Sequence, residues 1–145
     1  MQKGLMEDYR RPMLTVLLVG LLIGCRERRV EVSDPFYLDY IENPNAVSLR
    51  VCGENGCSGV EGLPSESGYG NGPHVIVAGA NQDFITVEQK QIGNDHGPSV
   101  YYYFARRFDP RTGGAAHPKI IGPLNEQQFL TRKVPLGLPD LSIKS

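Results

Sequence analysis

The chain has 145 residues and a formal net charge of −1, and 40% of its residues are hydrophobic. This length allows one domain with a modest core, and the near-neutral charge gives no reason to expect nucleic acid as a partner. The three histidines are scattered and no pair of cysteines has the spacing of a zinc motif, so the sequence predicts no metal site and no cofactor.

An apolar run over residues 13–24 ends at Cys25. As a helix, at 1.5 Å per residue, it would cover roughly 18 Å, which is too short for a hydrocarbon core of about 30 Å. Basic residues precede the run, as they do in secretory signal peptides. We therefore expect residues 1–24 to be a signal peptide, with a buried apolar helix containing an ordinary cysteine as the alternative.

Leu22, Gly24 and Cys25 end this run in an order that resembles the lipobox of bacterial lipoproteins. In that family the cysteine thiol receives a diacylglycerol, the peptide is cut before the cysteine, and the new amino group is acylated, for example with palmitate. Several acyl chains anchor a protein stably where one binds only marginally. The resemblance implies a lipid anchor at Cys25 and a place in the cell envelope. Arg26 stands where inner-membrane lipoproteins commonly carry Asp, which favours the periplasmic face of the outer membrane.

Residues 25–33 are polar and charged and predict a tether, followed by a single small domain over residues 34–145. The tether contains the basic cluster Arg26, Arg28 and Arg29. Such a cluster can contact anionic headgroups beside a lipid anchor, although a solvated tether is its more common role.

Cys52 and Cys57 are the pair that remains once Cys25 is acylated. In an oxidising compartment an even pair predicts a disulfide, and the Asn-Gly within residues 53–56 is a strong hairpin-turn signal. We therefore place the two cysteines opposite one another on a tight hairpin. The closed loop is short, so the expected stabilisation lies near the low end of about 2–4 kcal/mol.

Short segments rich in aromatic and β-branched residues alternate with turn signals along the rest of the chain. They predict a mainly β (α+β) fold, an antiparallel meander of about six to seven strands. The most apolar segment, 100–105, is expected at the sheet centre, and the polar segment 62–73 is expected to be a mobile loop with little connection to the core. Strands are expected at 36–41, 47–51, 58–61, 74–78, 84–90, 100–105 and 119–121.

A helix signal appears near the C-terminus. Asn125 is a good N-cap residue, Gln128 completes a capping box, and Leu124 with Phe129 matches a hydrophobic staple. We expect one short helix that packs on the sheet. The residues expected to face the sheet are Phe129, Leu130 and Val134, and those expected to end the helix are Pro135 and Gly137.

Three blocks, residues 79–85, 102–104 and 121–129, resemble the ordered blocks of an uncharacterised family of short bacterial lipoproteins. The resemblance covers about residues 34–138. Ala80 departs from the bulky aromatic residue expected after Gly79. The blocks are structural, namely a turn, a strand and a capped helix, and the family brings no activity or catalytic residues.

No catalytic motif is present. Ser58 lies in a near miss for a nucleophile elbow, because Val60 occupies the position where that motif needs glycine. Asp95 and His96 could act as a base and its orienting carboxylate, but they lie in a Gly/Pro loop where a solvated turn is the simpler interpretation. We therefore assign no catalytic residues. A small periplasmic hydrolase that uses these loop residues is the alternative function.

The tyrosines are the better candidates for binding. Tyr101 and Tyr103 point to one face of their strand and Tyr102 to the other, so one face is core and the other is either a binding platform or covered by a helix. Tyr69, within the loop 62–73, is like the aromatic tips of recognition loops. We expect a non-catalytic module that binds an envelope or periplasmic protein, as an inhibitor, an immunity-type factor or an assembly accessory, through Tyr69, Tyr101 or Tyr103.

Overall fold

The computed structural model describes residues 28–40, 46–65, 72–94, 96–106 and 118–145. The signal peptide and Cys25, the turn at 43–45 and Tyr69 lie outside these residues. The described part contains nine strands and one helix. Their bounds are β1 Arg29–Ser33, β2 Phe36–Tyr40, β3 Val47–Gly53, β4 Gly56–Gly59, β5 Pro73–Ala80, β6 Phe84–Gln91, β7 Val100–Ala105, β8 Ile121–Leu124, α1 Glu126–Leu136 and β9 Ile143–Lys144.

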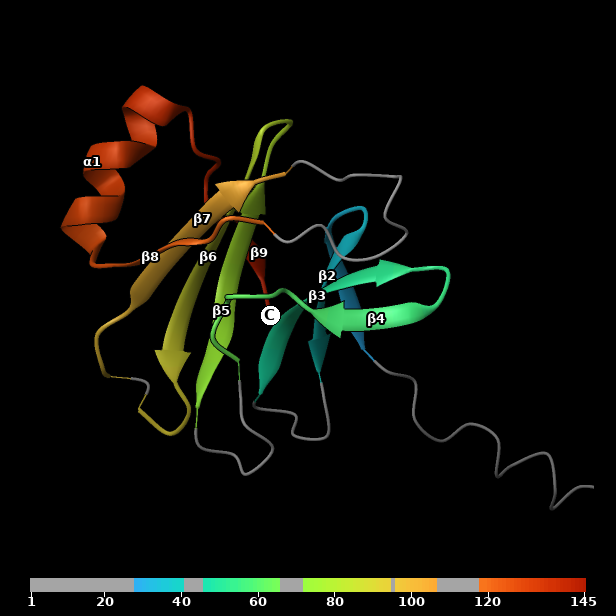
Figure 1. Cartoon of the computed structure of the whole chain (residues 1–145). Helices are drawn as coiled ribbons and strands as arrows, with labels where there is room; N and C mark the ends of the chain where they lie inside the picture. The colour runs from blue at the N-terminus through green and yellow to red at the C-terminus, as the bar shows by residue number, and fades with distance from the viewer. Residues whose placement is uncertain (1–27, 41–45, 66–71, 95, 107–117) are drawn as a thin grey trace, which may run out of the picture.

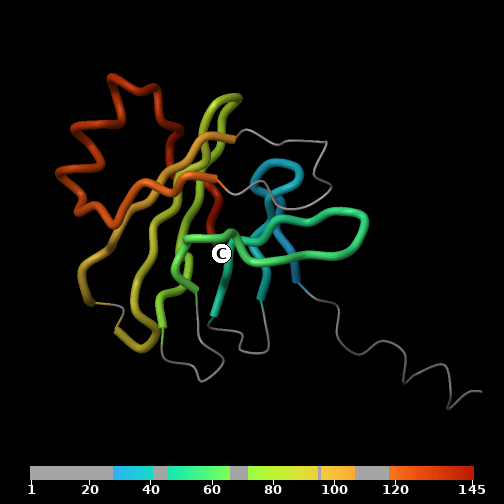
Figure 2. The backbone as a smooth tube through the Cα atoms, viewed as in Figure 1, coloured from blue at the N-terminus to red at the C-terminus, as the bar shows by residue number. Residues whose placement is uncertain are grey.

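Two antiparallel sheets and the helix form three layers (Figure 1). The four-stranded sheet has the order β1-β2-β3-β4 and the five-stranded sheet the order β8-β7-β6-β5-β9. The four-stranded sheet packs on one face of the five-stranded sheet through β1, β3 and β5, while α1 packs on β7 and β8. The expected mainly β fold with one short helix packed on it is confirmed. The strands are divided between two meanders, and the chain after α1 returns to place β9 beside β5 (Figure 2).

The main core lies between the two sheets. Phe36 of β2 and Phe104 of β7 meet there with ring centroids 5.6 Å apart. The other members are apolar residues contributed by both sheets and by the segment after β4. They include Leu38, Leu49, Val51, Val60, Leu63, Val75, Ala78, Ile85, Val87 and Tyr102.

Strand β1 corrects the expected tether. Residues 25–33 were expected to bury little, but Arg29–Ser33 pairs with β2, and Val32 is buried in the inter-sheet core. The side chains of this segment alternate between the two faces of the strand, as in any β-strand. Val30 and Val32 therefore point inward, while Arg29 and Glu31 are exposed. The high charge of the segment conceals this short apolar alternation.

The centre of the five-stranded sheet is β6, with two strands on either side, and the expected central position of residues 100–105 is wrong. Strand β7 is apolar because both of its faces are covered, one by the four-stranded sheet and one by α1. Coverage on both faces, rather than position in the sheet, explains its composition.

The start of segment 62–73 also belongs to the core, contrary to the expected independent loop. Leu63 is buried, and the fully buried Gln89 of β6 donates its Nε2 hydrogen to the Pro64 carbonyl oxygen at 2.8 Å. Because that bond gives the buried amide nitrogen of Gln89 its partner, it fastens this end of the segment to the sheet.

Helix α1 begins as the sequence predicts. The Asn125 side chain accepts a hydrogen bond from the Gln128 amide at 2.8 Å, and the Gln128 side chain accepts one from the Asn125 amide at 3.0 Å, which forms the capping box. Pro135 lies inside the helix and does not end it. The helix ends at Gly137, whose φ of 63° is the left-handed conformation that favours glycine.

The face of α1 that contacts the sheet is narrower than predicted. Phe129 is 3% exposed and stacks on Tyr101 with ring centroids 4.9 Å apart. Leu130 and Val134 are 52% and 85% exposed, so the prediction that they face the sheet is wrong. At 3.6 residues per turn they lie roughly 100° and 140° around the helix axis from Phe129. Arg132 lies on the sheet side instead, where its Nη1 contacts the Tyr103 hydroxyl at 3.5 Å.

We predict that Phe129→Ala lowers the free energy of unfolding by about 3–5 kcal/mol, because it removes the aromatic ring that fills the space between α1 and β7. The matched change one residue later, Leu130→Ala, should alter it by less than about 0.5 kcal/mol, because that side chain is exposed. Urea denaturation of the two variants measures the difference. Equal losses would contradict this orientation of the helix.

Candidate functional site

The predicted disulfide is present. Cys52 of β3 and Cys57 of β4 are partners in the register of the hairpin and are joined by an S–S bond of 1.97 Å. The Cys52 amide donates to the Pro35 carbonyl oxygen at 2.9 Å, which connects this hairpin to the turn between β1 and β2. The two packed sheets form a sandwich. The disulfide therefore fixes the part of the four-stranded sheet that lies beside the turn between β1 and β2, at one end of this sandwich.

Two arginines of the four-stranded sheet surround a buried carboxylate. Asp39 is 3% exposed, and its Oδ2 lies 3.5 Å from both Arg29 Nε and Arg50 Nη1. Arg50 also donates to the Cys57 carbonyl oxygen at 2.7 Å. These bonds link β1, β2, β3 and β4 across the sheet. They give Arg29 a structural role that a solvated tether would not have.

The expected tyrosine platform is covered. Tyr101 and Tyr103 share one face and Tyr102 faces the inter-sheet core, as the alternation predicts. Both Tyr101 and Tyr103 are only 8% exposed because α1 lies over them, so an exposed binding platform at these residues is wrong. Burial raises the pKa of Tyr101, and the charges of Glu88 and Glu126 raise it further.

The residues of the alternative hydrolase are not brought together in the described structure. Ser58 is exposed on β4 of one sheet, and His96 is exposed in the connection between β6 and β7 of the other. Asp95 lies outside the described residues. Among the residues that the structure describes, no group of three or more His, Cys, Asp or Glu side chains could hold a metal ion. In the same part of the chain, no helix is long and apolar enough to cross a membrane.

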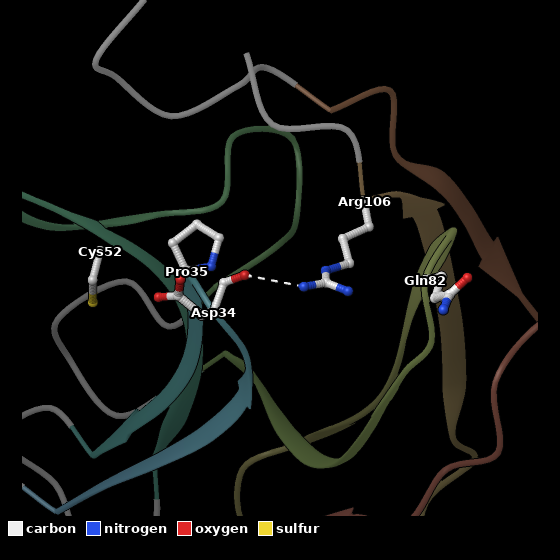
Figure 3. Close-up of a pocket in the computed structure, with 5 residues that line it drawn as sticks. All are labelled: Asp34, Pro35, Cys52, Gln82 and Arg106. Carbon is white, nitrogen blue, oxygen red and sulfur yellow. Dashed lines mark hydrogen bonds between the residues drawn. The ribbon is translucent and has the colours of Figure 1, made fainter. Parts of the chain in front are cut away.

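A pocket of about 400 Å³ opens at one end of the sandwich (Figure 3). Four separate parts of the chain form it: the turn between β1 and β2, the end of β3, the turn between β5 and β6, and the residue that follows β7. Sequence reasoning missed this site because no local pattern links these segments. Its lining residues are Asp34, Pro35, Cys52, Gln82 and Arg106.

Arg106 spans the gap between the two sheets at this pocket. Its Nη1 donates to the Asn81 carbonyl oxygen and its Nη2 to the Asp34 carbonyl oxygen, each at 3.3 Å. Its backbone amide donates to the Asp83 carbonyl oxygen at 2.8 Å. Figure 3 shows the guanidinium between Gln82 on one side and Asp34 with Pro35 on the other.

The outer side of α1 is the other candidate surface. Leu130 and Val134 form what we call the α1 patch, and they are the most exposed large hydrophobic side chains of the described residues. They lie one helical turn apart, and the neighbouring Gln127 and Thr131 are polar and exposed.

Comparison of the chain with protein-family models, with curated proteins and with solved structures found no match. The resemblance to short bacterial lipoproteins therefore stays a prediction from the sequence.

We predict that replacing both Cys52 and Cys57 with Ala lowers the free energy of unfolding by about 2 kcal/mol, the loop-closure contribution of a very short loop. Urea denaturation of oxidised wild type and the double variant measures this loss. Mass mapping of the protein isolated from the envelope should find the two cysteines joined to each other. Free thiols in that sample would contradict the assignment.

Proposed function

We propose that this protein is a lipid-anchored component of the bacterial cell envelope, and that its folded domain binds another protein and performs no catalysis. The anchor is supported by the apolar run that ends at Cys25. The binding role is supported above all by the α1 patch. The two parts are independent and have separate tests.

The α1 patch is suited to a helix-in-groove contact. Leu130 and Val134 remain 52% and 85% exposed on a helix with a complete capping box and a glycine C-cap. Apolar side chains at positions i and i+4 of a capped helix are the anchors that a helix-in-groove interface uses. Leu136, which is 43% exposed, adds apolar surface at the C-terminal end of the helix. The partner would present an apolar groove about two helical turns long.

The arrangement of polar residues favours binding over hydrolysis. Nucleophilic catalysis needs a base within hydrogen-bond reach of the nucleophile. Ser58 and His96 are exposed on different sheets, and neither lines the pocket at the end of the sandwich. A small periplasmic hydrolase is therefore the weaker of the two proposals.

The start of β1 limits how far the domain can lie from the membrane. Three residues separate Cys25 from Arg29, where β1 begins. Four residue steps span at most about 14 Å, so an acylated Cys25 keeps the domain close to the bilayer. Arg28, whose guanidinium lies 5.2 Å from the Tyr40 ring centroid, and Arg29 are then near the headgroups. The pocket adjoins the other end of β1, at Asp34 and Pro35.

We predict that Cys25→Ser leaves the protein extractable without detergent, or retained with an uncleaved signal peptide, because the acyl chains have no thiol to join. Fractionation of cells and the mass of the isolated protein measure this. A processed, acylated variant that stays with the membranes would show that the anchor is elsewhere.

To test the binding role, a photoreactive amino acid is placed at Val134 of the anchored protein in its native envelope, and at Glu54 in the turn between β3 and β4 as the exposed control. We expect a discrete protein adduct from position 134 and none of the same mass from position 54. Adding Leu130→Asp should remove that adduct, because a buried charge opposes docking into an apolar groove.

Two results would overturn this proposal. Adducts with lipid alone would make the α1 patch a membrane contact. Identical adducts from positions 134 and 54, unaffected by Leu130→Asp, would show that the patch has no specific partner.

A further inference from the structure

The pocket at the end of the sandwich carries charges of both signs. Asp34 and Arg106 both line it, yet the Arg106 guanidinium bonds to the backbone oxygen of Asp34 and not to its carboxylate. The Asp34 Oδ1 accepts a hydrogen bond from the Tyr37 hydroxyl at 3.3 Å. Opposite charges therefore border one space without neutralising each other directly.

Two backbone carbonyl oxygens hold the Arg106 guanidinium in place, and some of its N–H donors remain available for a ligand. Each terminal nitrogen of a guanidinium carries two N–H groups, and Nε carries a fifth. The bonds to the Asn81 and Asp34 carbonyl oxygens use one N–H from each terminal nitrogen. The remaining donors suit a carboxylate, whose two oxygens match the planar guanidinium. Because the protein backbone already orients the group, a ligand loses little free energy in ordering it.

The other lining residues suit a small organic ligand. Pro35 and Cys52 provide surface with little polarity, and the Gln82 side-chain amide provides a donor and an acceptor. The volume of about 400 Å³ lies within the range of small-molecule pockets, roughly 300–1,000 Å³.

We propose that this pocket binds a small zwitterion of the amino-acid type, with its carboxylate on Arg106 and its ammonium group on Asp34. A multiply charged anion such as phosphate would meet the Asp34 carboxylate, and a simple cation would meet Arg106, so each would gain one attraction and one repulsion. A zwitterion gains both attractions. The proposal uses no residue of the α1 patch and does not rest on the proposed function.

Titration of the isotope-labelled full chain in detergent micelles, followed by NMR, tests this proposal. The probes are alanine, acetate and methylammonium. We expect alanine to shift the backbone amide of Gln82 and the Nε–H of Arg106 saturably. Acetate should bind about tenfold more weakly than alanine, because it lacks the contact with Asp34, and methylammonium should bind more weakly still.

Substitutions separate the two contacts. Asp34→Asn should bring the affinity for alanine down to that for acetate. Arg106→Lys keeps the charge but loses the planar fork, so it should weaken both alanine and acetate. Arg132→Gln, on α1, is the matched control and should leave both affinities unchanged. The amide spectrum outside the pocket reports whether each variant stays folded.

The proposal is overturned if alanine produces no saturable shift, or if wild-type protein binds acetate as tightly as alanine. It is also overturned if Asp34→Asn, with its spectrum otherwise intact, still prefers alanine. Should Arg106→Lys unfold the chain, the Asp34→Asn comparison alone decides.

Discussion

The five-stranded sheet has apolar side chains on both faces, and each face needs its own cover. Strand β7 shows this most clearly. Tyr102 and Phe104 are buried against the four-stranded sheet, whereas Tyr101 and Tyr103 are buried beneath α1. Because successive residues of a strand point to opposite faces, one cover could not bury all four rings. The three-layer arrangement follows from this alternation.

The cover on the helix side depends on one close approach of the backbone. A Cβ atom at Gly79 would lie only 2.0 Å from the Asp140 carbonyl oxygen, so only glycine allows the chain after α1 to pass over β5. Asn81, in the following turn, donates its Nδ2 hydrogen to the Gly137 carbonyl oxygen at 2.8 Å and accepts from the Asp83 amide at 2.9 Å. The turn after β5 therefore binds the C-terminal end of α1 through Asn81. These contacts give a physical reason for Gly79 and Asn81 within the block 79–85.

Features set by short spacings could be predicted from the sequence, and features set by distant contacts could not. The capping box at Asn125, the hairpin between Cys52 and Cys57, and the two-faced tyrosine strand each depend on residues close in the chain. The prediction that Leu130 faces the sheet was wrong, because helical spacing predicts an apolar stripe but not how much of that stripe contacts the sheet. The pocket could not be foreseen, since Arg106 contacts the carbonyl of a residue 72 positions earlier.

The pocket adjoins the inter-sheet core, because its residues Pro35 and Arg106 lie next to the two aromatic residues that join the sheets. Pro35 directly precedes Phe36, the first residue of β2, and Arg106 lies two residues after Phe104 of β7. Pro35 and the disulfide-bonded Cys52 line the pocket on the side of the four-stranded sheet. The backbone carbonyl oxygens of Asp34 and Asn81, one from each of the two turns, lie at this end within reach of one side chain. The long side chain of Arg106 donates to both of these carbonyl oxygens. The guanidinium that bridges the two sheets therefore also places a positive charge at the pocket.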